Sequence, residues 1–265
     1  MDMRILLVAA LLVASRPLLS QTCSLPQGLY SERTRLEERY EKEVGNDYLP
    51  NKAIADEILR QKSSVDQKYL TYMVRVANGS SQAVNDCCPS SQQDPVALRV
   101  CALSSYMKGG RREITSFLAS VPTDKASAHS LWLLDEIAHS QGPRGDESKL
   151  PFGPSGPVST YIAGLYKLVL AGDQNAIRKY LGLFVLAQGD TGDAAEQMED
   201  YLEKLLVRKS ALVAENWSIF REYPKALANV DEMMSESERH RAVSSILREC
   251  SAKSLNCDGL TSALK

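Results

Sequence analysis

The feature that most constrains this chain is a recurring pattern in which an apolar helical segment ends at glycine and a second amphipathic segment follows at once. In residues 106–118 the first segment ends at Gly109 and Gly110, and in residues 169–181 it ends at Gly172. Glycine is a preferred residue where a helix stops and the chain reverses. The pattern therefore predicts helical pairs that pack back on themselves along the chain.

Helical spacing extends well beyond these two segments. Apolar residues recur every three or four positions through most of the chain, and no stretch shows the alternation of a half-buried strand. Asp94 and Pro95 predict the N-cap and first residue of one helix, and Ser235 with Glu238 predicts a capping box on the last long helix. We expect Pro224 to separate that helix from the one before it. The sequence thus predicts an all-α protein, an irregular stack of antiparallel helical hairpins that forms an α-α superhelix.

The second half of the chain also carries a repeat-like spacing. Leu165 returns 37 places later as Leu202, and the apolar residues of 177–184 return 36 places later in 213–220. A period of this length is typical of proteins built from helix-turn-helix repeats.

The turn at residues 171–173, followed by Ala176, Ile177 and Tyr180, is similar to the turn of a tetratricopeptide hairpin. Over about residues 94–250 the chain resembles α-helical repeat proteins of the HEAT or tetratricopeptide kind. The spacing from turn to isoleucine is a residue shorter than in the tetratricopeptide family, and that family's Trp-Leu-Gly opening is missing. The resemblance implies a non-catalytic scaffold that binds partners on a concave face, and no specific binding residue is carried over.

Residues 142–157 interrupt the helical pattern, because half of them are glycine or proline. We expect a linker here, joining an N-terminal helical lobe (21–141) to a C-terminal helical lobe (158–265). The alternative is a binding loop, since long loops without secondary structure are often functional. The candidates for binding in that loop are Arg144, Lys149 and Phe152.

The N-terminus has the layout of a signal peptide. Arg4 precedes a ten-residue apolar run, Ile5 to Ala14, and small residues follow it. The run is shorter than the ~20 residues that a membrane-spanning helix needs, so a permanent anchor is the less favoured alternative. We expect residues 1–20 to be removed, which leaves a secreted or periplasmic chain with no stable membrane span.

All six cysteines follow the expected cleavage region, and an even set in an exported chain predicts disulfides. They are Cys23, Cys87, Cys88, Cys101, Cys250 and Cys257. Cys250 and Cys257 are close enough to join the last long helix to the tail. Cys101 is expected to pair with Cys87 or Cys88, and the N-terminal cysteine with whichever remains. The alternative is a set of buried free thiols.

Charge argues against one class of partner. Without residues 1–20, which hold two basic residues and one acidic residue, the chain has 29 basic against 32 acidic side chains, a net charge of −3. Nucleic acid is therefore not expected as a partner.

One spacing indicates metal chemistry. Glu136 and His139 form the Glu-x-x-His pattern of carboxylate-bridged di-iron sites, and His129 lies on the same helix face. Such a site needs a second Glu-x-x-His, which this sequence lacks. The apolar residues of 131–138 place these side chains on the opposite, solvated face. We expect no metal and no cofactor, and Glu136 is the only candidate for a catalytic acid.

Taken together, these features predict an exported, disulfide-stabilised helical scaffold that binds a protein or an extracellular or envelope polymer without catalysis. Two alternatives stay open. One is an envelope or extracellular α-superhelical hydrolase that acts on glycans, with Glu136 as its acid. The other is a helical carrier of an apolar ligand.

Overall fold

The computed structural model describes residues 23–88, 93–109, 111–140, 149–188 and 192–264. Within these residues the backbone forms fourteen helices and no strand, so the predicted all-α fold is confirmed. The expected signal peptide, residues 1–20, lies outside them. The helices are α1 (Leu29–Glu43), α2 (Lys52–Asn78), α3 (Ser81–Cys87), α4 (Pro95–Lys108), α5 (Arg111–Ser120), α6 (Lys125–Ser140), α7 (Gly156–Leu170), α8 (Gln174–Ala187), α9 (Gly192–Arg208), α10 (Ser210–Glu215), α11 (Trp217–Phe220), α12 (Pro224–Met233), α13 (Glu236–Ala252) and α14 (Leu260–Ala263).

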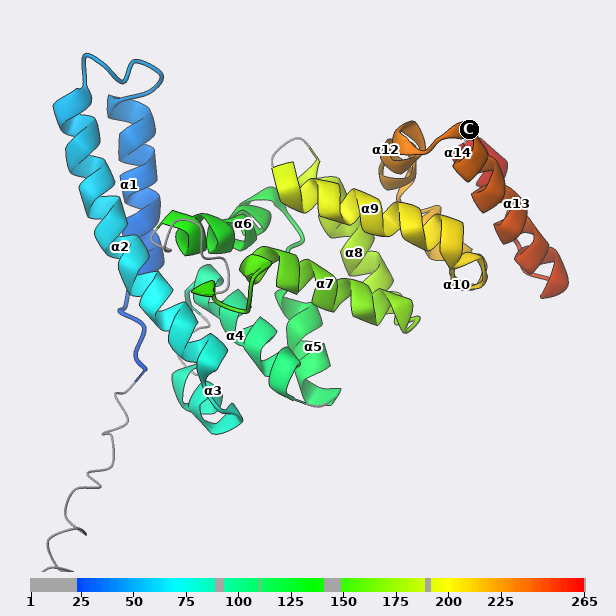
Figure 1. Cartoon of the computed structure of the whole chain (residues 1–265), viewed down its shortest axis with the longest axis horizontal. Helices are drawn as coiled ribbons and strands as arrows, with labels where there is room; N and C mark the ends of the chain where they lie inside the picture. The colour runs from blue at the N-terminus through cyan, green and yellow to red at the C-terminus, as the bar shows by residue number, and fades with distance from the viewer. Residues whose placement is uncertain (1–22, 89–92, 110, 141–148, 189–191, 265) are drawn as a thin grey trace, which may run out of the picture.

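Several pairs of consecutive helices pack on each other as hairpins. Helices α1 and α2 form a long hairpin, here called the arm, that projects from one end of the molecule, and the C-terminal helices lie at the other end (Figure 1). Between these ends α4 packs on α5 and α7 packs on α8. The 36–37-residue offset relates α7 to α9 and α8 to the α10–α11 segment, so the repeat-like spacing corresponds to successive helical pairs.

Local signals start and stop these helices as expected. The Asp94 carboxylate accepts hydrogen bonds from the first turn of α4, and Ser235 and Glu238 form the complete capping box of α13. Gly172 ends α7 with a φ of 79°, a left-handed conformation that favours glycine. Gly109 instead follows α4 in an extended conformation, so the two glycine turns differ. One expectation is wrong in detail, because Pro224 begins α12, an additional helix, rather than merely separating its neighbours.

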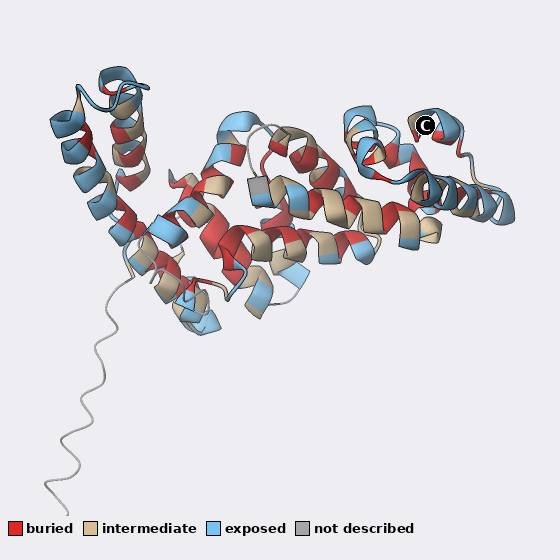
Figure 2. Ribbon diagram, turned by 45° about the horizontal axis from the view of Figure 1, so that its top comes forward, coloured by how far each residue is buried: buried red, intermediate tan, exposed pale blue. Residues whose placement is uncertain are grey.

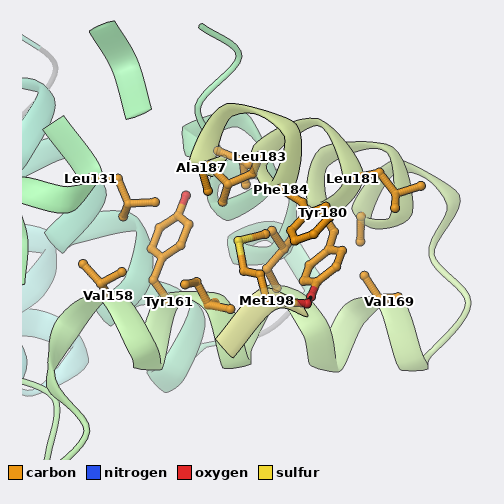
Figure 3. Packing of buried hydrophobic residues seen from close by; sticks show 14 of the residues in the cluster. Leu131, Val158, Tyr161, Val169, Tyr180, Leu181, Leu183, Phe184, Ala187 and Met198 are labelled. Atoms are coloured by element: carbon orange, nitrogen blue, oxygen red, sulfur yellow. Dashed lines mark hydrogen bonds between the residues drawn. The ribbon is translucent and has the colours of Figure 1, made fainter. Parts of the chain in front are cut away.

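Buried residues run continuously through the middle of the molecule, whereas the free end of the arm is mostly exposed (Figure 2). Figure 3 shows Leu131, Tyr161, Tyr180 and Met198, from four successive helices α6 to α9, in one packed layer. The Tyr180 hydroxyl donates to the Met198 carbonyl at 2.6 Å, which satisfies its only polar atom inside this layer.

Of the Gly/Pro-rich stretch 142–157, the structure describes residues 149–157. Residues 149–155 form turns, and α7 already begins at Gly156, inside the stretch 142–157 that the sequence indicates as the break. Helices from both sides of the break pack directly, since α4 and α6 contact α7, and α5 and α6 contact α8. The core therefore continues across the break, and the division into two lobes stays a prediction.

The three expected disulfides are present. Cys250 pairs with Cys257, and of the two open alternatives Cys101 pairs with Cys88, which leaves Cys87 for the N-terminal cysteine, Cys23. The Cα–Cα distances are 4.8, 5.8 and 6.2 Å in chain order of the pairs. The first two bonds join the segment before α1 to α3 and α3 to α4. No helix in the described part of the chain is long and apolar enough to cross a bilayer.

Candidate functional site

A buried arginine lies at the base of the arm, where α1 meets α2 and α6. The Arg33 side chain is 0% exposed and pairs with carboxylates on all three helices. Its Nε lies 3.2 Å from Glu37, a terminal nitrogen lies 2.8 Å from Glu136, and the other terminal nitrogen pairs with Asp66, itself 4% exposed. The three guanidinium nitrogens are compensated by charge pairing rather than by well-aligned hydrogen bonds. A buried guanidinium requires such compensation.

The remaining members of this charge cluster lie nearer the surface. Lys62 donates to Glu136 at 2.6 Å, and the His129 Nε2 lies 3.7 Å from Glu37. Burial raises the pKa of Glu136, but the Lys62 hydrogen bond and the positive charge of Arg33 outweigh it, so that pKa lies below its ordinary value. Glu136 is thus held as a carboxylate, which is the opposite of what a general acid needs.

The Glu37 carboxylate, as hydrogen-bond acceptor and as a nearby negative charge, raises the pKa of His129, although burial acts in the opposite direction. The cluster therefore pairs its acidic and basic groups internally. Its clearest role is to attach the arm to α6.

His139, the second member of the Glu-x-x-His spacing, lies away from Glu136's partners. Its Nδ1 donates to the Asp135 carbonyl at 2.8 Å, and the Asp135 carboxylate accepts from the Val158 backbone at 3.0 Å. In the described residues no three His, Cys, Asp or Glu side chains are placed to hold a metal ion. The structure therefore brings His129 and Glu136 into the charge cluster and leaves His139 outside it.

The loop candidates are dispersed. Arg144 lies outside the described residues, Lys149 is exposed in a turn, and Phe152 packs against the core. The backbone at Phe152 has a φ of 68°, and its carbonyl accepts a 3.4 Å hydrogen bond from Thr160 on α7. This part of the loop is thus fastened to α7.

A larger feature is a groove between α4, α5 and α7 with a volume of about 710 Å³. The groove is lined by Leu103, Tyr106, Met107, Gly109, Arg111, Ile114, Thr160, Ala163, Gly164 and Lys167. This volume lies within the range of pockets that bind small molecules or a few side chains of a peptide.

The glycine-terminated hairpin of α4 and α5 builds the floor of the groove. The Tyr106 ring stacks on Phe117, with centroids 4.5 Å apart, and its hydroxyl donates to the Gly164 carbonyl at 3.3 Å. A Cβ added at Gly164 would lie 3.1 Å from the Tyr106 ring, so glycine lets this ring lie close against α7. Burial raises the pKa of Tyr106, which keeps its hydroxyl protonated as a donor. The floor is therefore apolar and held in place.

The charged residues that line the groove are both basic. Arg111 at the start of α5 and Lys167 on α7 are its charged lining residues, and both are exposed. Within the described part of the chain neither makes an ion pair with a carboxylate. Met107, near the end of α4, also lines the groove and is 55% exposed, which is high for a large apolar side chain. The groove thus offers apolar surface with two cations at its edge, and its lining contains no His, Asp, Glu or Cys that would serve as acid, base or nucleophile.

The helical spacing of the sequence predicts Tyr106, Met107 and Ile114 on the apolar side of the α4–α5 hairpin. It does not indicate that α7 leaves part of this apolar side uncovered. The chain matches no family model, no curated protein and no solved structure, so a function for it rests on the chemistry of this groove.

Proposed function

We propose that this protein is an exported, non-catalytic interaction protein whose groove binds an acidic, amphipathic segment of a partner protein. The observation that carries the proposal is the apolar floor flanked by Arg111 and Lys167, two cations from different helices without a carboxylate partner among the described residues. A segment with one apolar face and adjacent carboxylates would satisfy both parts of the groove.

Export is part of the proposal and rests on two features. Three disulfides are typical of chains that fold in an oxidising compartment. The apolar run near the N-terminus has the layout of a secretory signal. A secreted or periplasmic location accounts for both.

The two alternatives have less support. A carrier encloses most of its ligand's surface, whereas Met107, Arg111 and Lys167 leave the edge of this groove open to solvent. A glycan-cleaving enzyme needs a carboxylic acid that holds its proton, and the pKa of Glu136 is shifted in the opposite direction.

The test uses a fluorescent helical peptide of about 12 residues, with leucines on one face and glutamates beside them, and a scrambled peptide of the same composition. Fluorescence anisotropy measures the affinity of the full mature chain for each. We expect Arg111→Glu combined with Lys167→Glu to weaken binding of the amphipathic peptide at least about tenfold, and added salt to weaken it as well.

The matched control is Lys225→Glu combined with Arg248→Glu, which makes the same charge change on exposed positions of α12 and α13. Affinity should be retained in this variant apart from a small general effect of net charge. Equal affinity for the scrambled peptide, or an equal loss in both double variants, would refute a specific role of the groove.

A further inference from the structure

We infer that the segment that occupies the groove is the tip of the arm of a second copy of this chain. The tip comprises residues 45–51, which connect α1 to α2. This inference rests on the proposed function, because it names the partner of the same groove.

The tip presents apolar side chains to solvent. Leu49 is 82% exposed and Tyr48 is 37% exposed, at the free end of a hairpin that extends away from the body (Figure 1). The start of α2 partly covers Tyr48, through Lys52 over its ring and Asp56 at its hydroxyl, whereas Leu49 is left largely open to solvent. A leucine so exposed at the most distant point of a hairpin does not contribute to the core of its own copy.

The conformation of the tip is defined by local contacts. The Asp47 amide donates to the Val44 carbonyl at 3.3 Å, and the Lys52 amide donates to the Leu49 carbonyl at 3.4 Å. The Tyr48 hydroxyl donates to the Asp56 carboxylate on α2 at 3.1 Å. Because these contacts are already formed, little ordering entropy is lost when the tip binds.

The charge of the tip complements that of the groove. Asp47 directly precedes the two apolar residues, is exposed, and makes no ion pair within the described part of the chain. The groove in turn carries Arg111 and Lys167 without carboxylate partners there. The tip thus combines apolar side chains with a carboxylate, and the groove combines apolar surface with two cations, so the two surfaces are complementary.

Exposure points to the same two surfaces. Among the large hydrophobic side chains of the described residues, Leu49 is the most exposed and Met107, at 55%, is the next. One lies on the tip and the other lines the groove. Contact between copies would cover both.

The arm cannot reach the groove of its own copy. The tip and the α4–α5 hairpin lie on different sides of the molecule (Figure 1), and the base of the arm is fixed by the Arg33 ion pairs and the Cys23–Cys87 disulfide. Tip and groove are also different surfaces, so the contact is heterologous. Repetition of such a contact produces a ring or an open chain of copies.

Sedimentation velocity of the full mature chain tests the inference. A contact of this size is expected to be weak, with a dissociation constant of about 10–100 µM, so samples run from about 1 µM to about 0.5 mM. We expect the weight-average mass to rise across this range. Leu49→Asp and the Arg111→Glu/Lys167→Glu variant should each remain monomeric, with unchanged circular dichroism because all three positions are exposed.

Mixing the two variants gives the decisive measurement. The groove of the Leu49→Asp chain and the tip of the Arg111→Glu/Lys167→Glu chain are both intact, so the mixture should form a one-to-one complex and stop there. A wild type that remains monomeric throughout, self-association that survives either variant, or a mixture without heterodimer would overturn the inference.

Self-association tests the second-copy inference and peptide binding tests the proposed function, so the two can fail separately. If the chain remains monomeric but the amphipathic peptide binds in the groove, the groove serves a different acidic protein and the second-copy inference is wrong. If the chain remains monomeric and the peptide does not bind, both are wrong. A labelled fatty acid that binds in place of the peptide would also overturn both.

Discussion

Replacing Arg33 by methionine should strongly destabilise the protein, because Arg33 is buried and pairs with a buried carboxylate. Methionine retains most of the packing of the arginine stem but removes the charge that compensates Asp66. Removing one partner of a buried ion pair costs about 3–5 kcal/mol, because the remaining charge is left buried without compensation. Glu37 and Glu136 are more exposed than Asp66 and can be hydrated, so Asp66 accounts for most of the expected loss.

Urea unfolding followed by circular dichroism measures this loss as a change in the free energy of unfolding. In a thermal scan the same loss corresponds to a midpoint about 6–20 °C lower, at about 2–4 °C per kcal/mol for a chain near this size. The matched control is Arg39→Met on the same helix, whose ion pair with Glu43 is exposed and should contribute no more than about 0.5 kcal/mol.

A double variant separates charge burial from packing. Arg33→Met combined with Asp66→Asn leaves no buried charge at this position, so it should lose less stability than Arg33→Met alone. If Arg33→Met loses no more than the Arg39→Met control, or if the double variant loses the sum of the two single changes, the account of the arm's attachment is refuted.

Three further predictions concern pH, a disulfide and a helix cap. The raised pKa of His129 beside Glu37 stabilises the fold fully below the ordinary pKa of 6.5, and this contribution is lost as pH rises through the folded-state value. His129→Gln should therefore reduce the loss of stability above pH 6.5 in urea titrations, and an unchanged pH profile would contradict this. Replacing Cys23 and Cys87 by serine opens a loop with a sequence separation of 64, and should lower the free energy of unfolding by about 4 kcal/mol in the chain-entropy model. Asp94→Ala removes the N-cap of α4 and the 2.7 Å hydrogen-bond partner of the buried Tyr69 hydroxyl, so it should lower the free energy of unfolding by about 2–4 kcal/mol. Asp94→Asn should retain much of the cap and lose less. Similar losses in both variants would show that the cap is unimportant.

Much of the fold follows from local signals in the sequence. The caps at Asp94 and Ser235, the proline after the first of these, and the glycine turn at Gly172 fix helix ends through contacts within a few residues. The breaks among α9 to α12 are less predictable, because they depend on how this end of the chain packs. Asn216, for example, separates α10 from α11 while its side chain donates to the Leu212 carbonyl one turn earlier.

The charge cluster has a sequence signal that is easy to overlook. Arg33 lies four residues after Leu29 and three before Leu36, on the helix face that both leucines bury. A basic residue on an apolar stripe predicts a buried charge with a partner elsewhere. Its partners on α2 and α6 come from distant positions, and a single sequence does not identify them.

The groove is a property of tertiary packing. Met107 and Arg111 belong to a hairpin that the sequence indicates clearly. How much of that hairpin α7 covers depends on the angle at which the helices cross. Sequence periodicity identifies apolar faces but does not say which part of a face lacks a neighbour.

The Cys23–Cys87 disulfide gives the arm an unusual covalent position, because the whole arm lies within the loop that this bond closes. Under tension between points before Cys23 and after Cys87, force passes across the disulfide and bypasses the arm. A protease that cuts between Tyr48 and Leu49 would likewise release no fragment, since the piece that begins before α1 stays bonded through Cys23. The nicked protein would migrate as one band until it is reduced, so the tip of the arm, with its exposed Leu49, can be cut without being lost.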